Sequence, residues 1–228
     1  MQWVKNYDLY LFDFDGLLVN TEEMHYNAYR RMLKNNGIDF SWDFNRYCQA
    51  AHYQATALKE QIYQEYPDLF KREPVWDVLY KQKQEALLNL VDEGAAHLMP
   101  GVKELLETLE KAGVKRAVVT HSPDKLIQKI RKQNPLLNSI PTWITREHYE
   151  KPKPDPECYR KAIDILKPNG KVIGFEDTPR GLTALFGTNA EAVLICTAEY
   201  PEIPEFIKRG AKRHPTLKDW VDKQLAQV

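Results

Sequence analysis

From about Gly94 to the end of the chain, short apolar segments alternate with amphipathic helical segments. Helices are expected to begin at Pro100, Pro123, Pro156 and Pro179, because proline favours a first helical turn and apolar residues recur at helical spacing after each. The apolar segments expected to form strands are residues 115–120, 142–145, 172–175 and 192–195. Alternation with nearly continuous apolar strands is typical of a parallel sheet covered on both faces. The sequence therefore predicts an α/β fold with a Rossmann-like parallel-sheet core.

A helical block interrupts the alternation after the first expected strand. Residues 41–93 are rich in Gln, Tyr, Leu and Lys, and they show no hairpin signal. Before them, His25, Ala28, Tyr29 and Met32 recur at helical spacing behind Thr21, which can cap a helix. We therefore predict an α/β core formed by residues 1–16 and 95–228, with an inserted α-helical cap domain formed by residues 17–94.

The charge balance and the apolar pattern exclude several classes of protein. The 228 residues include 32 Lys and Arg and 32 Asp and Glu, so the zero net charge indicates neither nucleic-acid nor membrane-surface binding. No apolar run approaches the roughly 20 residues that a membrane span needs, and the first residues lack the apolar part of a signal peptide. Three widely spaced cysteines indicate no disulfide framework. We expect a cytoplasmic monomer with no nucleic-acid or membrane partner.

The first apolar run of the chain ends in two aspartates. Asp13 and Asp15 flank Phe14 and precede Gly16 in the segment D-L-Y-L-F-D-F-D-G. Side chains two apart on a strand point to the same side, so both carboxylates could serve one site while Phe14 points into the core. Because two like charges this close repel each other, we expect a positive group beside them, most simply a divalent cation.

Polar residues also follow the later expected strands. Ligands of open α/β sheets bind beyond the carboxyl ends of the strands, so we consider the residues that lie there. They are Thr120, His121 and Ser122 after the second strand, Lys151 after the third, and Glu176 and Asp177 after the fourth. The chain thus offers two acids, a hydroxyl, a lysine and two more acids, in that order.

This order resembles the four motifs of the haloacid dehalogenase-like superfamily. The matching segments are D-F-D-G-L-L-V-N-T-E, V-V-T-H-S, K-P-K-P-D-P and G-F-E-D-T-P-R-G. The chain is most similar to the phosphatase and phosphomutase branch, which carries a helical cap after the first motif, and the resemblance spans nearly the whole length. It implies phosphoryl transfer with Asp13 as the nucleophile, forming an aspartyl-phosphate, and Asp15 as the general acid and base.

The resemblance also implies a phosphate site and a magnesium site. Thr120 and Lys151 would be catalytic and would contact the phosphate, with Gly16, His121 and Ser122 also binding the substrate. The metal set implied for Mg²⁺ comprises Asp13, Asp15, Glu176 and Asp177, with the backbone carbonyl of Asp15 as its contribution and Glu176 further from the ion. Carboxylates and water are ligands that suit this small, hard ion.

Residues of the expected cap have two interpretations. By resemblance His25 would help to position the substrate, although its helical phase equally fits a buried packing histidine. The aromatic residues Trp42, Phe44, Tyr47 and Tyr53 could stack on a sugar or base, but cap-core packing is favoured for them.

Three functional hypotheses remain at this point. The first is a Mg²⁺-dependent phosphatase acting on a small phosphorylated metabolite, such as a sugar phosphate. The second is a phosphomutase like β-phosphoglucomutase. Relatives of that kind carry a Gly-rich, Arg-containing loop in the cap, whereas this chain reads C-Q-A-A-H-Y-Q-A-T-A-L-K there. The third is a non-catalytic binding protein on the same fold, which the intact set of acids argues against.

Overall fold

The computed structural model describes residues 3–53 and 55–226, and the side chains of residues 52–57 lie outside this description. The chain divides into two compact units, an α/β unit of Met1–Asn20 with His97–Val228 and a helical unit of Thr21–Ala96. The sequence had placed the two boundaries a few residues earlier, at 16/17 and 94/95. Tyr53, considered above for stacking, has its side chain outside the description.

Within the described residues, the α/β unit is built on one parallel sheet of six strands, in the order β3-β2-β1-β4-β5-β6. The strands are β1 (Leu9–Phe12), β2 (Lys115–Val119), β3 (Thr142–Ile144), β4 (Val172–Glu176), β5 (Glu191–Ile195) and β6 (Lys212–His214). The residues of β1 are all buried, and β1 pairs with β2 on one side and β4 on the other. The predicted Rossmann-like fold is confirmed.

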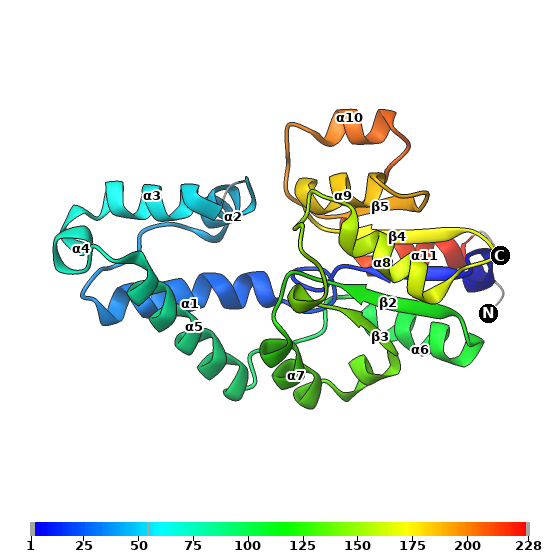
Figure 1. The fold of residues 1–228 in the computed structure, drawn as a ribbon, viewed down its shortest axis with the longest axis horizontal. Helices are drawn as coiled ribbons and strands as arrows, with labels where there is room; N and C mark the ends of the chain where they lie inside the picture. The colour runs from blue at the N-terminus through cyan, green and yellow to red at the C-terminus, as the bar shows by residue number, and fades with distance from the viewer. Residues whose placement is uncertain (1–2, 54, 227–228) are drawn as a thin grey trace. The chain divides into compact units, whose positions relative to one another are not determined.

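Helices cover both faces of this sheet (Figure 1). They are α6 (Val102–Ala112), α7 (Asp124–Gln133), α8 (Glu157–Leu166), α9 (Pro179–Phe186), α10 (Ile203–Lys208) and α11 (Leu217–Leu225), with single turns η1 (Trp3–Asn6), η2 (Pro135–Ser139) and η3 (Arg146–His148). Strand residues alternate between the faces. Leu9 and Leu11 of β1 belong to the core that includes Tyr159 of α8, whereas Tyr10 meets the ring of Trp220 of α11 at 6.4 Å.

This alternation decides which side chains can meet at the end of the sheet. Asp13 has the parity of Leu9 and Leu11, and the register that pairs Phe12 with Phe175 places Asp13 beside Glu176. Both carboxylates therefore project toward the face that α8 covers. The hydrogen bond from Asp13 N to Phe175 O, 3.0 Å long, extends the pairing to the first residue of the site.

The helical unit contains α1 (Thr21–Asn35), α2 (Phe44–Tyr53), α3 (Ala55–Glu65), α4 (Pro67–Arg72) and α5 (Trp76–Asp92). Its core includes Met32 and Leu33 of α1 and Leu79 of α5. Arg31 of α1 donates to both carboxylate oxygens of Glu93 at 2.7 and 2.5 Å. This ion pair joins α1 to the residue that follows α5. None of the described helices is both long enough and apolar enough to cross a bilayer.

Two elements of the C-terminal region differ from the sequence interpretation. Helix α10 and the edge strand β6 are absent from the helices and strands expected from the sequence. Strand β6 reads K-R-H and has no apolar residue, so hydrophobic periodicity could not reveal it. It forms by pairing with β5, in a register that places His214 beside Ile195.

Candidate active site

The centre of the candidate site is a buried ion-pair network at the end of β1. Lys153 Nζ lies 2.5 Å from Asp13 Oδ1, 2.6 Å from Glu176 Oε1 and 3.0 Å from Val119 O. All three hydrogens of the ammonium group thus have an acceptor. The hydroxyl of Tyr159, on the inward face of α8, also donates to Glu176 Oε1. Lys153 and Glu176 are about as buried as the apolar core around them.

Burial and charge act together on this network. Burial raises the pKa of Asp13 well above its usual range, and the carboxylates of Glu176 and Asp15 raise it further, while Lys153 opposes both. Burial would lower the pKa of Lys153, but the negative charges of Asp13 and Glu176 outweigh it and hold that pKa well above normal. Lys153 therefore stays positively charged at this site. The carboxylates of Asp13, Glu176 and Asp15 outnumber this one positive charge.

The lysine predicted for this position was the wrong one of two. Lys151 is exposed, and its backbone N–H donates to Glu157 Oε2 at 2.8 Å. Lys153, two residues later, enters the core instead. The K-P-K-P segment offers two lysines, and its prolines give no means of choosing between them. The nearest signal in the sequence is Tyr159, which shares one face of the helix after Pro156 with Ala162 and Leu166 and therefore lies where a buried lysine would find partners.

Asp15 is held by two hydroxyl groups. Thr120 Oγ1 donates to Asp15 Oδ2 at 2.8 Å, and Ser122 Oγ lies 3.0 and 2.9 Å from the two carboxylate oxygens. The backbone N–H of Ser122 in turn donates to Thr120 Oγ1 at 2.9 Å. In this structure Thr120 and Ser122 therefore orient the second aspartate, whereas the sequence assigned them to a phosphate. The two roles are compatible, because a hydroxyl can rotate to a new acceptor.

The turn after β1 depends on a glycine. Gly16 has φ of 74°, a left-handed conformation that glycine adopts without a steric cost. Its N–H donates to Val19 O at 2.9 Å, and Leu18 N donates back to Phe14 O at 3.0 Å. The turn therefore brings Asp15 back over the strand ends. Gly16 therefore lies next to the two acids. Its contact with a substrate stays a prediction.

His121 borders the cluster beside Tyr149. Its Nδ1 is hydrogen-bonded to the hydroxyl of Tyr149, which donates to Thr120 O at 3.0 Å. Burial lowers the pKa of His121 to about 3, and the charges of Lys153, Arg180 and Arg146 act in the same direction. His121 is therefore a neutral ring among cations. Tyr149 was missed by the sequence interpretation, since no strand end or motif marks it.

Three carboxylates can supply ligands to one metal ion. Oxygens of Asp13, Glu176 and Asp177 lie within 4.8 Å of one another. Lys153 carries a single positive charge beside these three carboxylates, so it offsets only part of their negative charge. An all-oxygen set with excess negative charge suits Mg²⁺. The residues thus fit the expected ion, and Glu176 is the carboxylate that both Lys153 and Tyr159 contact.

A close helix approach fixes Glu176 in this arrangement. Helix α9 begins after Thr178, whose side chain accepts the N–H of Gly181 at 3.2 Å. A Cβ added at Gly181 would overlap the Glu176 carboxylate. The first turn of α9 can therefore lie against the acid only because residue 181 has no side chain.

The remaining predicted residue, His25, belongs to the helical unit. Its Nδ1 lies 2.5 Å from Lys83 Nζ of α5. Burial lowers the pKa of His25 to about 3, and Lys83 lowers it further. Lys83 also lies 5.1 Å from the ring centre of Tyr29. His25 is therefore buried among its neighbours in the helical unit, which fits its second interpretation as a packing histidine. Its contact with a substrate stays a prediction.

The aromatic residues of the helical unit divide in the same way. Trp42 and Tyr47 are buried in its core, whereas 39% of Phe44 is exposed. The rings of Phe44 and Tyr47 lie 6.4 Å apart in a stacked arrangement. Core packing, the favoured interpretation, therefore describes Trp42 and Tyr47.

Known proteins resemble this chain over most of its length. A family model described as haloacid dehalogenase-like hydrolase matches residues 10–195. The chain is a member of that family. Protein CbbY of Cereibacter sphaeroides is 27% identical over 81% of this chain and 82% of its own length. A phosphorylated carbohydrates phosphatase of Thermotoga maritima is 25% identical over 80% of this chain and 82% of its own length.

The solved structures of this family share the fold. The crystal structure of CbbY from Rhodobacter sphaeroides in complex with phosphate superposes with a TM-score of 0.70 at 24% identity, covering 93% of this chain and 95% of that one. These matches confirm the predicted haloacid dehalogenase-like family and the predicted enzyme class, a phosphoric monoester hydrolase.

Proposed function

We propose that this hydrolase is a Mg²⁺-dependent phosphatase that removes the phosphate of a small phosphorylated metabolite through an aspartyl-phosphate on Asp13. The observation that carries the proposal is the position of Asp13. Asp13 directly follows β1, an interior strand of the sheet, and its Oδ1 lies 2.5 Å from Lys153 Nζ. Its carboxylate also lies close to those of Glu176 and Asp177, with which it could bind a metal ion. A carboxylate so placed can attack phosphorus, since positive charge beside it offsets the repulsion from the phosphate.

The reaction would take place in two steps. In the first, an Asp13 oxygen forms a bond to phosphorus as the ester P–O bond breaks, and Asp15 gives its proton to the departing alcohol oxygen. In the second, Asp15 takes a proton from water as the water oxygen attacks phosphorus. The acyl-phosphate bond then breaks and inorganic phosphate leaves. The hydroxyl of Ser122, at 3.0 and 2.9 Å from the two oxygens of Asp15, would hold it in place for both transfers.

Mg²⁺ would be bound by Asp13 and Asp177, with the backbone carbonyl of Asp15 as a further oxygen ligand. It would supply positive charge for the phosphate oxygens and keep Asp13 ionised despite burial. Glu176 would act through Lys153, holding the ammonium group beside Asp13. Thr120, Lys153 and the amides that follow Thr120 would bind the phosphate.

A sugar phosphate is the substrate class that the relatives favour. The Thermotoga maritima relative is named for phosphorylated carbohydrates, and that chemistry is compatible with an acid–base residue beside a nucleophile. The helical unit would act as a cap that selects the substrate, with His25 assisting. Its buried, neutral ring would contribute a hydrogen bond rather than a charge. We place the enzyme in the cytoplasm as a monomer.

Release of phosphate from a panel of sugar phosphates in the presence of Mg²⁺ tests this function. The proposal expects free phosphate from at least one of them, lost in Asp13→Asn and kept in Asp164→Asn, a matched exposed position on α8. Conversion of β-glucose 1-phosphate into glucose 6-phosphate without free phosphate would instead identify a phosphomutase. No turnover of any compound by the folded, Mg²⁺-loaded protein would favour a binding protein.

A further inference from the structure

Tyr159 of α8 contacts both members of the ion pair that lies beside Asp13. The side chain is fully buried, and its hydroxyl donates a hydrogen bond to Glu176 Oε1. The same oxygen accepts a hydrogen bond from Lys153 Nζ at 2.6 Å. The tyrosine ring also covers the lysine, since Lys153 Nζ lies 5.0 Å from the ring centre. Tyr159 is therefore placed to influence where the ammonium group lies.

The hydrogen bonds of Lys153 are divided evenly among three acceptors. Its ammonium group has three hydrogens, and Nζ lies 2.5 Å from Asp13 Oδ1, 2.6 Å from Glu176 Oε1 and 3.0 Å from Val119 O. A carboxylate oxygen has two lone pairs with which to accept hydrogen bonds. Because Tyr159 and Lys153 occupy both on Glu176 Oε1, this oxygen cannot accept a second hydrogen of the ammonium group. One N–H of Lys153 therefore stays directed to Asp13.

Helix α9 confines the Glu176 carboxylate from another side. A Cβ added at Gly181 would overlap both oxygens of this carboxylate, so the first turn of α9 leaves it little room to move. The hydroxyl of Tyr159 holds it at Oε1, and hydrogen bonds to a charged group are among the stronger ones in proteins. Without that hydroxyl, Oε1 would have a free lone pair and would draw the ammonium group of Lys153 away from Asp13.

We propose that Tyr159 is a positioning residue for phosphoryl transfer, whose hydroxyl holds Glu176 so that the ammonium group of Lys153 stays beside Asp13. This role rests on the proposed phosphatase activity. Positive charge that is fixed in advance, where negative charge develops, contributes strongly to catalysis. A small displacement of Lys153 from Asp13 should therefore slow the reaction. Tyr159 acts only through Glu176 and Lys153.

Tyr159→Phe tests this role, because it removes the hydroxyl and keeps the ring that covers Lys153. The matched control is Tyr10→Phe, which makes the same chemical change at another fully buried tyrosine. The hydroxyl of Tyr10 donates to Val4 O at 3.2 Å, so both variants lose one buried hydrogen bond.

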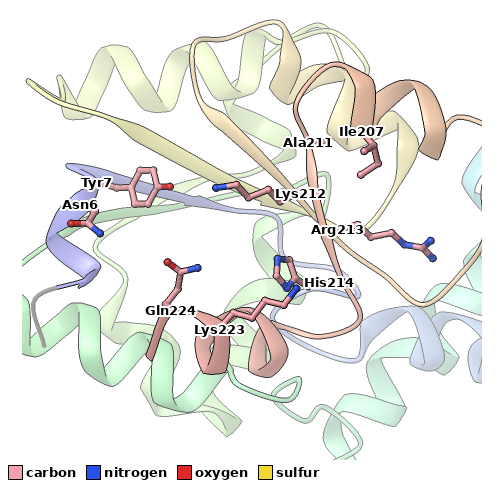
Figure 2. Close-up of a pocket in the computed structure, with 9 residues that line it drawn as sticks. All are labelled: Asn6, Tyr7, Ile207, Ala211, Lys212, Arg213, His214, Lys223 and Gln224. Atoms are coloured by element: carbon pink, nitrogen blue, oxygen red, sulfur yellow. The ribbon is translucent and has the colours of Figure 1, made fainter. Parts of the chain in front are cut away.

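The control position lies apart from the candidate active site. Tyr10 faces Trp220 of α11, on the side of the sheet opposite to α8. Its ring centre lies 5.8 Å from that of Tyr7. Tyr7 lines a polar pocket together with residues such as His214 and Lys223 (Figure 2), and this pocket shares no residue with the acidic cluster. A change at Tyr10 therefore reports the loss of a buried hydroxyl without a change at Lys153.

Steady-state kinetics with a sugar phosphate that the enzyme hydrolyses separate positioning from a structural role. Tyr159→Phe should lower kcat about tenfold, which corresponds to about 1.4 kcal/mol, and should leave KM within about twofold of the wild-type value. Tyr10→Phe should leave both constants unchanged, although urea unfolding should show similar losses of stability in the two variants. Equal kcat values for the two variants, or a raised KM with an unchanged kcat in Tyr159→Phe, would overturn the proposal.

Calorimetric titration with beryllofluoride in the presence of Mg²⁺ needs no turnover. Beryllofluoride mimics a phosphoryl group on a carboxylate, so it would meet Asp13 and Lys153. Tyr159→Phe should weaken its apparent affinity about tenfold, or about 1.4 kcal/mol, whereas Tyr10→Phe should not. A wild-type protein that hydrolyses no compound but shows this difference would refute the phosphatase and leave the placement of Lys153 by Tyr159 intact. Turnover with equal beryllofluoride affinity in the wild type and both variants would refute the role of Tyr159 alone.

Discussion

Lys153→Met would remove the ammonium group that lies between Asp13 and Glu176 while keeping a side chain of similar length. Three interactions disappear together: the two ion pairs at 2.5 and 2.6 Å and the hydrogen bond to Val119 O at 3.0 Å. Breaking a buried ion pair by removing one partner costs about 3–5 kcal/mol, because the remaining charge stays buried without compensation. We expect a loss of that size in the free energy of unfolding, measured without metal.

Urea unfolding in EDTA, followed by circular dichroism, measures this loss. With a denaturant slope of about 2 kcal/mol per molar urea, the midpoint should fall by roughly 2 M. The matched control is Lys151→Met, two residues away in the same segment and exposed, which should change stability by no more than about 0.5 kcal/mol. The reasoning is refuted if Lys153→Met costs less than about 1 kcal/mol, or if the two variants cost the same.

Three other outcomes follow from the site. Ser122→Ala removes the hydroxyl that contacts both oxygens of Asp15 and should lower kcat about tenfold, whereas Ser139→Ala, at a buried hydroxyl without a partner in the described chain, should leave kcat unchanged. Gly181→Ala should displace Glu176 and cost about 1–3 kcal/mol, in contrast to Gly170→Ala, where the nearest atom is 3.5 Å away. Because burial lowers the pKa of His121 to about 3, the unfolded chain binds a proton below about pH 6.5 that the folded chain does not. Stability should therefore fall as the pH is lowered from about 6.5 toward about 3, and less steeply in His121→Asn; equal slopes would contradict this cause.

The acids of the site could be predicted because they follow apolar strands directly. Asp13 directly follows β1 and Glu176 ends β4, and the sequence identifies both apolar segments as strands. Parallel pairing of these strands then places the two acids side by side. The lysine could not be assigned in the same way. Lys151 and Lys153 both follow a strand of three residues through a turn, and only packing against Tyr159 and Glu176 decides which of them is buried.

Strand β6 shows a second limit of sequence patterns. Its residues K-R-H are polar and alternate across an edge strand, where one neighbour rather than two supplies the hydrogen bonds. Apolar periodicity therefore marks the central strands and misses this edge. His214 is buried by the helix that follows it, a tertiary effect that no local signal contains.

The account depends most on the acyl-phosphate expected at Asp13. Rapid mixing of the Mg²⁺-loaded enzyme with a sugar phosphate that it hydrolyses, followed by borohydride reduction, would convert such an adduct into homoserine. Peptide mass spectrometry then locates the modified residue. The account predicts homoserine at position 13, absent when substrate is omitted. Homoserine at Asp15 or Asp177, or continued turnover with no reduced residue, would contradict it.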